Sequence, residues 1–283
     1  MSIVITGSSG QLARSVIDNA LEAVEAPNLI LVTRSPGDLA PYEDGGARVR
    51  FGDFEQPGSL SDAFAGGERM LLISTDAVGD RIDQHAAAID AAGEAGVELV
   101  AYTSIVNPVA ENSAFVVPDH AATEQKLRES GLGWVFLRNS LYAEFQAASM
   151  AAAAESGVLV TNSGSGQVAY VSRDDCAAAA AAVLVSGGHA GATYDITGPE
   201  LLDASARADI FSSITGKDIA VVEVDDDSYA QGVADAIGLP FDAARGMASF
   251  GMATRDGYLA VISSDFEKLT GRKPRDLRSV LTH

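Results

Sequence analysis

A glycine-rich segment near the N-terminus has the residue types needed to hold a pyrophosphate. It reads Thr6-Gly7-Ser8-Ser9-Gly10-Gln11-Leu12-Ala13 and directly follows a short β-branched run. Gly7 permits a tight turn, Gly10 lets the backbone approach an anion, and Ala13 is small enough for a helix to pack close to the strand. Amides at the start of that helix would face the phosphates. The segment predicts a dinucleotide-binding loop, and a plain strand-to-helix turn is the alternative.

Residues at the ends of the next two expected strands indicate which dinucleotide the loop serves. NAD sites typically have an acidic residue there for the ribose 2′-hydroxyl, but this chain has Arg34 followed by Ser35. A guanidinium at that position pairs with a 2′-phosphate, which favours NADP(H), although an arginine that is simply exposed at a strand end is the alternative. Asp53 could accept a hydrogen bond from the adenine amino group, and Phe54 could flank the adenine ring. The alternative is that both residues belong to a turn that ends a strand.

The sequence lacks the catalytic pair of the common ketone-reducing short-chain dehydrogenases. Those enzymes use a tyrosine and, four residues later, a lysine that lowers the tyrosine pKa. Four residues after each of the seven tyrosines stand Gly46, Val106, Gln146, Asp174, Gly198, Val233 and Ile262. The helix expected to carry the pair has His120 and Glu124 instead. His120 could donate a proton to a substrate oxygen with Glu124 orienting it, or it could only cap and pack a helix start.

Composition excludes several other classes of function. Nineteen Lys+Arg against 39 Asp+Glu give a net charge of -20, and such a surface repels nucleic acids and anionic membranes. Cys176 is the single cysteine, so we expect no disulfide, no metal site and a cytoplasmic location. The longest run of small apolar residues, 176–185, is too short to cross a bilayer. No G-x-S-x-G turn occurs, which argues against a hydrolase.

Short β-branched runs alternate with helical patterns through the first half of the chain. The expected strands are residues 3–6, 29–33, 49–51, 70–74, 99–103 and 134–137. This rhythm is typical of right-handed βαβ units, so we predict an α/β fold with a doubly wound parallel Rossmann sheet. The helix expected at residues 80–95 would bury a face made of Ile82, Ala86, Ile89, Ala92 and Gly93. Gly96 would end that helix.

The alternation weakens after residue 137, which predicts a smaller α+β C-terminal substrate lobe. Its expected helices are residues 140–155, 204–215 and 228–237, and its expected strands are 158–161, 168–171 and 193–196. The domains would be residues 1–139, which bind NADP with parts of 157–200 packing back on them, and residues 140–283, which bind substrate. Small ligands usually bind in the cleft between such units.

Short motifs in order along the first two-thirds of the chain carry a family resemblance. They are T-G-x-x-G-Q-L at 6–12, Arg34, G-D-F at 52–54, L-L-I-S at 71–74, Y-T-S at 102–104, H-x-A-T-E at 120–124, L-R-N-x-L-Y at 137–142 and E-S-G-x-x-V-T-N-x-G-S-G at 155–166. Together they resemble the NmrA-like atypical short-chain dehydrogenases, in particular the type 2 NAD(P)H:quinone oxidoreductases and the triphenylmethane reductases. Ala13, the Ser8-Ser9 pair and residues 105–119 depart from that pattern, which leaves the substrate open.

The resemblance implies hydride transfer from NADP(H), without flavin or metal, to a conjugated small molecule such as a quinone or dye. It implies no nucleic-acid or membrane partner, and a homodimer stays open. The cofactor-binding residues would be Thr6, Gly7, Ser8, Ser9, Gly10, Gln11, Leu12, Arg34, Asp53, Phe54, Ser74, Thr75, Thr103, Leu137, Arg138, Asn139 and Ser140. The catalytic set would be Ser104, His120, Asn139 and Tyr142. Asn139 and Tyr142 would face the acceptor, unless Asn139 only bonds its turn and Tyr142 only packs between the lobes.

Two functions from different classes fit these residues. A reductase needs no tuned tyrosine, because a quinone or cationic dye accepts a hydride readily once it is held against the nicotinamide. A non-catalytic NADP(H)-binding redox sensor of the NmrA type would lack the Tyr/Lys pair as well. We favour the reductase, because residues 137–142 and 155–166 resemble the reductases and no unusual insertion offers a partner surface. A reductase or epimerase that uses His120 as its acid is a third hypothesis.

Overall fold

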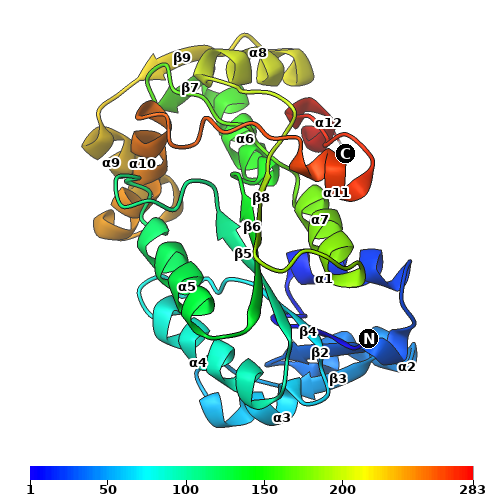
Figure 1. The fold of residues 1–283 in the computed structure, drawn as a ribbon. Coiled ribbons are helices and arrows are strands. Elements are labelled where there is room, and N and C mark those ends of the chain that lie inside the picture. The colour runs from blue at the N-terminus through cyan, green and yellow to red at the C-terminus, as the bar shows by residue number, and fades with distance from the viewer. Residues whose placement is uncertain (283) are drawn as a thin grey trace.

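Buried β-branched runs form the centre of a seven-stranded sheet in the computed structural model, which describes residues 1–282 (Figure 1). In spatial order the strands are β3 (Arg48–Phe51), β2 (Leu29–Thr33), β1 (Ile3–Ile5), β4 (Arg69–Leu72), β5 (Leu99–Ile105), β6 (Gly133–Asn139) and β8 (Ala192–Ile196). Every neighbouring pair runs parallel. The predicted doubly wound α/β fold is confirmed, and all six expected strands of the first half occur.

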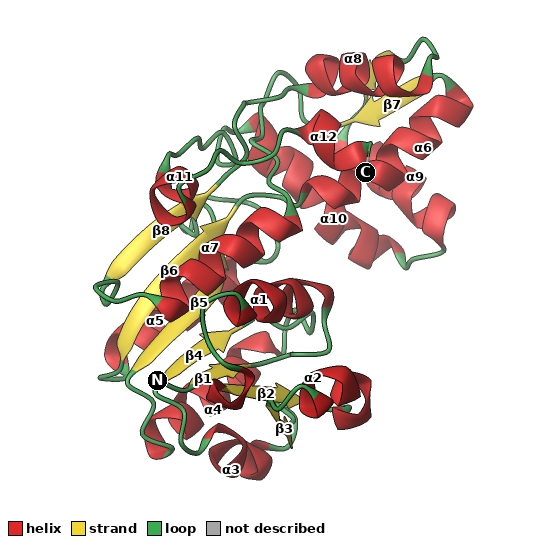
Figure 2. Ribbon diagram, turned by 90° about the vertical axis from the view of Figure 1, so that its right-hand side faces the viewer, coloured by secondary structure: helices red, strands yellow, loops and turns green. Residues whose placement is uncertain are grey.

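Helices cover both faces of this sheet, as Figure 2 shows. One face carries α1 (Gln11–Leu21), α7 (Arg173–Val185) and α11 (Asp265–Thr270). The other carries α3 (Leu60–Phe64), α4 (Arg81–Glu94) and α5 (Val117–Glu129), while α2 (Ala40–Asp44) follows β2. Side chains alternate between the faces along each strand, so Ile3 and Ile5 pack toward α1 and α7 while Val4 packs toward α3 and α4. Burial on both faces explains why the central strands read as continuous apolar runs.

The alanine-rich run at 176–185 forms most of α7, which is buried between the sheet and α1. The Ser172 hydroxyl caps the helix by accepting from the amide of Asp175 at 3.0 Å. Asp175 is itself fully buried, and Arg272 donates to its carboxylate at 2.7 Å. Within residues 1–282 no helix combines the length and the apolar character needed to cross a membrane.

Two of the strands expected after residue 137 take other roles. Residues 192–196 pair with β6 from Val135↔Ala192 to Asn139↔Ile196, so this strand extends the main sheet and does not belong to the second lobe. The strand expected at 168–171 is wrong: Val171 bridges Tyr142 in parallel, whereas Val168 bridges Leu202 antiparallel. No single partner runs alongside this segment, because it crosses from one lobe to the other.

The second lobe begins after β6 and contains a two-stranded parallel sheet, β7 (Val158–Thr161) with β9 (Ala220–Glu223). Its helices are α6 (Gln146–Ser156), α8 (Ala204–Thr215), α9 (Asp226–Ile237), α10 (Phe241–Arg255) and α12 (Leu277–Leu281). The helix expected from residue 140 starts only at 146, because Ser140 still donates its amide to Ile196 and Ala143 donates to Val171. The sequence did not indicate β9, α10, α11 or α12.

The buried face of α4 differs from the one expected. Ile82 is 40% exposed, whereas Arg81 and His85 are buried together with Ile89 and Ala92. Polar partners on α5 and β5 explain the rotation, because His85 meets Thr123 and packs edge-on against Tyr102. Gly96, with φ +78°, ends the helix as predicted.

Two helical glycines of the second lobe provide a matched test of this packing. A Cβ at Gly251 of α10 would lie 1.8 Å from Oδ1 of Asn162, whereas a Cβ at Gly232 of α9 would meet nothing within 4 Å. We therefore expect Gly251→Ala to lower the free energy of unfolding by about 1–3 kcal/mol through overpacking. Gly232→Ala should raise it by about 0.5–1 kcal/mol, since alanine favours the helix. Urea unfolding followed by circular dichroism measures both, and shifts of the same sign would contradict the packing described.

Candidate functional site

A cavity of about 400 Å³ lies at the carboxyl ends of β1, β2, β3 and β4. Residues from all four strand ends line it: Gly7, Ser9, Gly10, Thr33, Arg34, Asp53, Phe54, Ser74 and Thr75. The chain order of the strands reverses between β1 and β4, which is the switch point where open α/β sheets bind ligands. Eight of the residues expected to bind a cofactor therefore meet at one cavity, together with Thr33.

The glycine-rich loop has the geometry of an anion-binding turn. Gly7 has φ +59°, and the amide of Gly10 donates to the Gly7 carbonyl at 2.8 Å. Gly10 is the N-cap of α1 and supplies no side-chain cap, so the first-turn amides have no side-chain oxygen competing for them. The Thr6 hydroxyl donates to the Leu71 carbonyl at 3.0 Å and accepts from the amide of Ile73 at 3.1 Å. This pair of bonds ties the loop to the end of β4.

The remaining loop residues support the turn or lie outside the cavity. Ser8 is fully buried, and its hydroxyl donates to the Ile5 carbonyl at 2.6 Å. Leu12 belongs to the core between α1 and the sheet, while Gln11 is exposed and does not line the cavity. The Thr33 hydroxyl donates to Ser9 Oγ at 3.0 Å and so fixes the loop against the end of β2.

Arg34 is an exposed cation on the cavity wall. Among residues 1–282 it has no carboxylate within 4.0 Å and no hydrogen bond to another side chain, so its guanidinium is available to a ligand. Asp53 differs, because its carboxylate already accepts from the amide of Glu55 at 3.1 Å and from Gln56 at 2.9 Å. The half-buried ring of Phe54 lies beside it. The free positive charge at this end of the cavity suits a phosphate on the ribose.

Polar groups without partners gather where β4 and β6 end. Thr75 Oγ1, Asn139 Oδ1 and Ser140 Oγ are buried and have no hydrogen-bond partner among the described residues. The amide of Ser74 donates to Thr103 Oγ1 at 2.9 Å, so Thr103 holds the turn after β4. Unpartnered buried oxygens are costly unless a ligand or water bonds them, and a carboxamide supplies both donors and an acceptor. The residues present therefore fit a nicotinamide at this place.

His85 supports that turn and was not indicated by the sequence. The Thr123 hydroxyl donates to the Asp119 carbonyl, so it accepts from His85 Nδ1 at 2.9 Å. The opposite nitrogen, Nε2, then accepts from the amide of Thr75 at 3.1 Å. Burial and the nearby Arg81 lower the pKa of His85 to about 3, which keeps this lone pair available at neutral pH. In the sequence, His85 is only a polar residue within an expected helix, so nothing there indicated that it would hold this turn.

His120 does not line the cavity. It is 7% exposed, with Nδ1 2.8 Å from the Tyr102 hydroxyl and Nε2 3.4 Å from a guanidinium nitrogen of Arg81. Burial and Arg81 lower its pKa to about 3, so the imidazole is neutral at pH 7. His120 thus lies on α5 where this helix packs against α4 and β5, and Arg81 and Tyr102 hold its ring in place.

The expected His120–Glu124 contact is wrong, because Glu124 is bound elsewhere. Its carboxylate accepts from Arg138 at 2.9 and 2.7 Å, from Arg128 at 3.0 Å and from the Ser104 hydroxyl at 2.8 Å. The Glu124 side chain is only 2% exposed, and these hydrogen bonds raise the pKa of Arg138. Two expected site residues, Ser104 and Arg138, are therefore joined by one buried carboxylate.

Tyr142 lies three residues after Asn139, the last residue of β6, and its ring points toward α7. The Arg173 guanidinium lies 5.4 Å from its ring centroid, and burial raises the pKa of its phenol. The phenol oxygen is 3.5 Å from Nδ2 of Asn139. Tyr142 does not line the cavity. Leu137, on β6, is buried in the core below this turn.

Sequence comparison detects an extensive similarity to known proteins. A family described as NAD(P)H-binding matches residues 7–186. Quinone oxidoreductase 2 of Escherichia coli (strain K12) is 33% identical over 282 residues, which cover 99% of this chain and 98% of that protein. The resemblance noted in the sequence is thereby confirmed over nearly the whole chain.

Solved structures agree with this finding over both lobes. The NADPH-dependent quinone oxidoreductase of Escherichia coli complexed with NADPH has a TM-score of 0.95 and 32% identity, over 99% of each chain. The triphenylmethane reductase of Citrobacter sp. complexed with NADP(H) has a TM-score of 0.91 and 34% identity, over 100% of this chain and 99% of that one.

The depressed pKa values of His85 and His120 predict how both imidazoles titrate. Each should stay neutral down to about pH 4, while the same residues in the urea-unfolded chain titrate near 6.5. The two histidines therefore contribute stability that is present above pH 6.5 and is lost as the pH falls from 6.5 toward 3. Imidazole nitrogen shifts in NMR spectra measure both states. An imidazolium signal from His120 at pH 6 would contradict the buried, neutral assignment.

Proposed function

The chain belongs to the NAD(P)H-binding family, and on that premise we propose that it is an NADPH-dependent oxidoreductase that reduces a quinone or another conjugated, electron-poor small molecule. The observation that carries the proposal is the cavity that joins the phosphate loop to the free guanidinium of Arg34. When bound, NADPH would supply a hydride and leave as NADP⁺; a quinone takes up this hydride with one proton from solvent to give a hydroquinone, whereas a cationic dye takes up the hydride alone.

The residues around the larger cavity would divide the dinucleotide among them. Gly7, Ser9, Gly10 and the first amides of α1 bind the pyrophosphate, and Arg34 binds the 2′-phosphate. Phe54 flanks the adenine ring, with Asp53 fixing the turn beside it. Thr6, Ser8, Leu12 and Thr33 hold the loop, while Gln11 contributes its backbone amide at the start of α1.

The ends of β4, β5 and β6 would hold the nicotinamide. Thr75, Asn139 and Ser140 offer the unpartnered groups that bond its carboxamide. Thr103 and Ser74 shape the turn after β4, and the backbone of Leu137 and Arg138 forms the floor. A fixed ring orients the reacting carbon toward the acceptor and excludes water, which is the main demand of this reaction.

The four residues expected to be catalytic would have different roles. Asn139 stays beside the reacting atoms, because its amide oxygen is unpartnered. Ser104, His120 and Tyr142 are positioning residues, because each one is bonded or stacked within the protein. A neutral His120 is not a general acid at pH 7, because its one remaining N–H is a very weak acid, so the proton that completes the reduction of a quinone comes from solvent.

The proposal extends to the organisation of the molecule. Residues 1–139, together with α7, β8 and α11, form the dinucleotide-binding domain, and the remainder of residues 140–282 forms the acceptor lobe. Neither a flavin nor a metal is needed, because quinones and cationic dyes accept a hydride directly. We propose a cytoplasmic enzyme, and a homodimer is the assembly to test first.

A panel of acceptors tests the activity itself. NADPH oxidation at 340 nm should proceed with a benzoquinone, a naphthoquinone or a triphenylmethane dye, and should be absent with a simple ketone. The ketone is excluded because no tuned proton donor faces the site. Tight NADPH binding without turnover by any member of the panel would overturn the reductase and favour a redox sensor.

Arg34→Ala tests the choice of dinucleotide. Loss of a charge-assisted contact with the 2′-phosphate should weaken NADPH binding by about 10- to 100-fold and change NADH binding by less than about threefold. Arg245→Ala is a matched control, since the side chain of this arginine is 62% exposed on α10 and does not line the cavity. Isothermal titration calorimetry measures the dissociation constants of NADPH and NADH for the wild type and for both variants. Equal weakening of both dinucleotides would count against the assignment.

A further inference from the structure

A second cavity, of about 110 Å³, lies inside the second lobe between the end of β7 and helices α6, α8, α9 and α10. No residue lines both this cavity and the larger one. Its volume is of the same order as the ~150 Å³ cavity that holds benzene in another protein. Met247, 43% exposed, forms part of its wall, so the cavity reaches the surface. The space suits one six-membered ring.

This cavity lies beyond the carboxyl end of β6, on the far side of that strand end from the dinucleotide cavity. The larger cavity includes Ser74 and Thr75 in the turn after β4, and β5 and β6 follow β4 in the sheet. β6 ends at Asn139, with its unpartnered amide oxygen, and Leu141 two residues later lines the second cavity. A nicotinamide at the end of β6 would therefore lie between the two cavities. The second one is placed to receive part of an acceptor.

Arg207 is the unusual group of this cavity. One guanidinium nitrogen donates to Gln146 Oε1 at 2.9 Å, and the guanidinium carbon lies 5.7 Å from the ring centroid of Tyr170. Among residues 1–282 no carboxylate lies within 4.0 Å of it, although the chain has 39 acidic residues against 19 basic ones. Asp203, one helical turn earlier, instead caps α8 by accepting from the amide of Ala206 at 2.8 Å.

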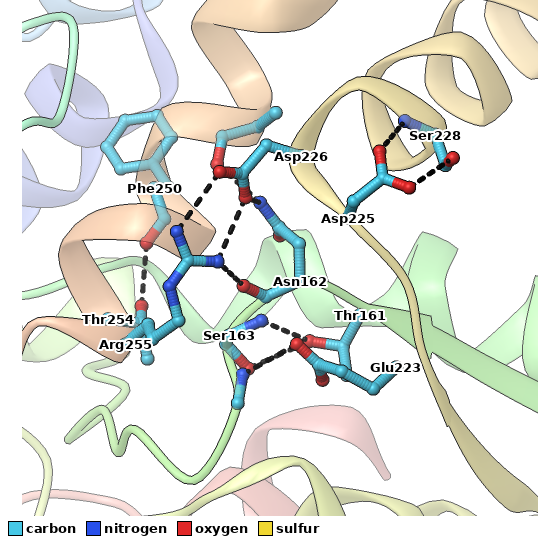
Figure 3. A network of polar contacts seen from close by, with 12 residues as sticks. Thr161, Asn162, Ser163, Glu223, Asp225, Asp226, Ser228, Phe250, Thr254 and Arg255 are labelled. Atoms are coloured by element: carbon cyan, nitrogen blue, oxygen red, sulfur yellow. Dashed lines mark hydrogen bonds and ion pairs between the residues drawn. The ribbon is translucent and has the colours of Figure 1, made fainter.

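Asn162, which lines this cavity, is bonded to Asp226, an acidic residue that does not line the cavity and whose charge is already balanced. Figure 3 shows Arg255 bonded to both carboxylate oxygens of Asp226, each at 3.0 Å. Asn162 donates to the same carboxylate at 2.8 Å and to the Ala248 carbonyl at 2.9 Å. These hydrogen bonds lower the pKa of Asp226 and fasten α9 and α10 to the end of β7. The side of the cavity that Asn162 forms is therefore fixed. Two charged side chains line the cavity, Asp203 and Arg207; the Asp203 carboxylate accepts from the start of α8, and Arg207 is the cation available to a ligand.

We propose that this cavity binds one ring of the acceptor and that Arg207 selects acceptors whose ring carries negative charge, such as an ionised hydroxyl group. The inference rests on the proposed reductase function. The ring would pack among Tyr170, Phe250 and Leu141, with the guanidinium donating to the charged oxygen. The side-chain NH₂ of Gln146 is free to donate as well, because its oxygen is held by Arg207.

Arg207→Met tests this selection with two naphthoquinones that differ in charge. The probes are 1,4-naphthoquinone, which is neutral, and 2-hydroxy-1,4-naphthoquinone, which is an anion at pH 7. The variant should raise KM for the anion by about 10- to 100-fold and for the neutral quinone by less than about threefold. NADPH affinity should not change, Arg207→Lys should restore part of the loss, and Arg245→Met should match the wild type. Equal effects on the two quinones, or no effect, would overturn the proposal.

A binding measurement separates this proposal from the reductase itself. If neither quinone is reduced, 2-hydroxy-1,4-naphthoquinone is titrated by calorimetry into the NADP⁺-loaded wild type and into the Arg207→Met variant. Binding by the wild type and a loss of at least about tenfold in the variant would support the cavity assignment while the reductase fails. Absence of binding to the wild type would overturn the assignment. Matching thermal unfolding curves show that the variant is folded.

Discussion

The buried carboxylate of Glu124 is the interaction on which the geometry at the ends of β5 and β6 depends. It joins α5 to β5 through Ser104 and to β6 through Arg138. A charge that is taken out of water is tolerated only when it is paired and fully hydrogen-bonded, and here four donor bonds meet that requirement. Arg138 immediately precedes Asn139, so the position of the Asn139 amide is set by a contact on the opposite side of the sheet.

A second group of contacts acts in the same way at the end of β4. Thr6, Thr103 and His85 hold the turn that contains Ser74 and Thr75. All these partners are buried, and the lowered pKa of His85 keeps its acceptor nitrogen available across the physiological pH range. The dinucleotide cavity is therefore shaped by neutral, fixed hydrogen bonds, which suits a reaction that needs orientation more than proton transfer.

The sequence predicted those features that depend on local chemistry. The glycines of the phosphate loop, Arg34 and the strands β1 to β6 follow from residue type and short-range pattern. The structure brings the glycines and Arg34 together at one cavity, where β1 to β4 end. Contacts between distant segments could not be read in this way. Glu124 binds Arg138 and not His120, because β6, which carries Arg138, lies beside β5 in space. The pairing of β8 with β6 likewise has no signal in the local sequence. The smaller cavity depends on five separate elements, so residues such as Arg207 and Gln146 carried no motif.

The return of the chain to the main sheet limits how such a molecule can diversify. After β6 the chain enters the second lobe, comes back through α7 and β8, and leaves again to complete that lobe (Figure 1). Exchange of the acceptor lobe as one contiguous gene segment would remove the helix that covers Ile3 and Ile5 and expose the edge of β6. New acceptor preferences should therefore arise through point changes on α6, α8 and α10 and not through recombination of whole lobes.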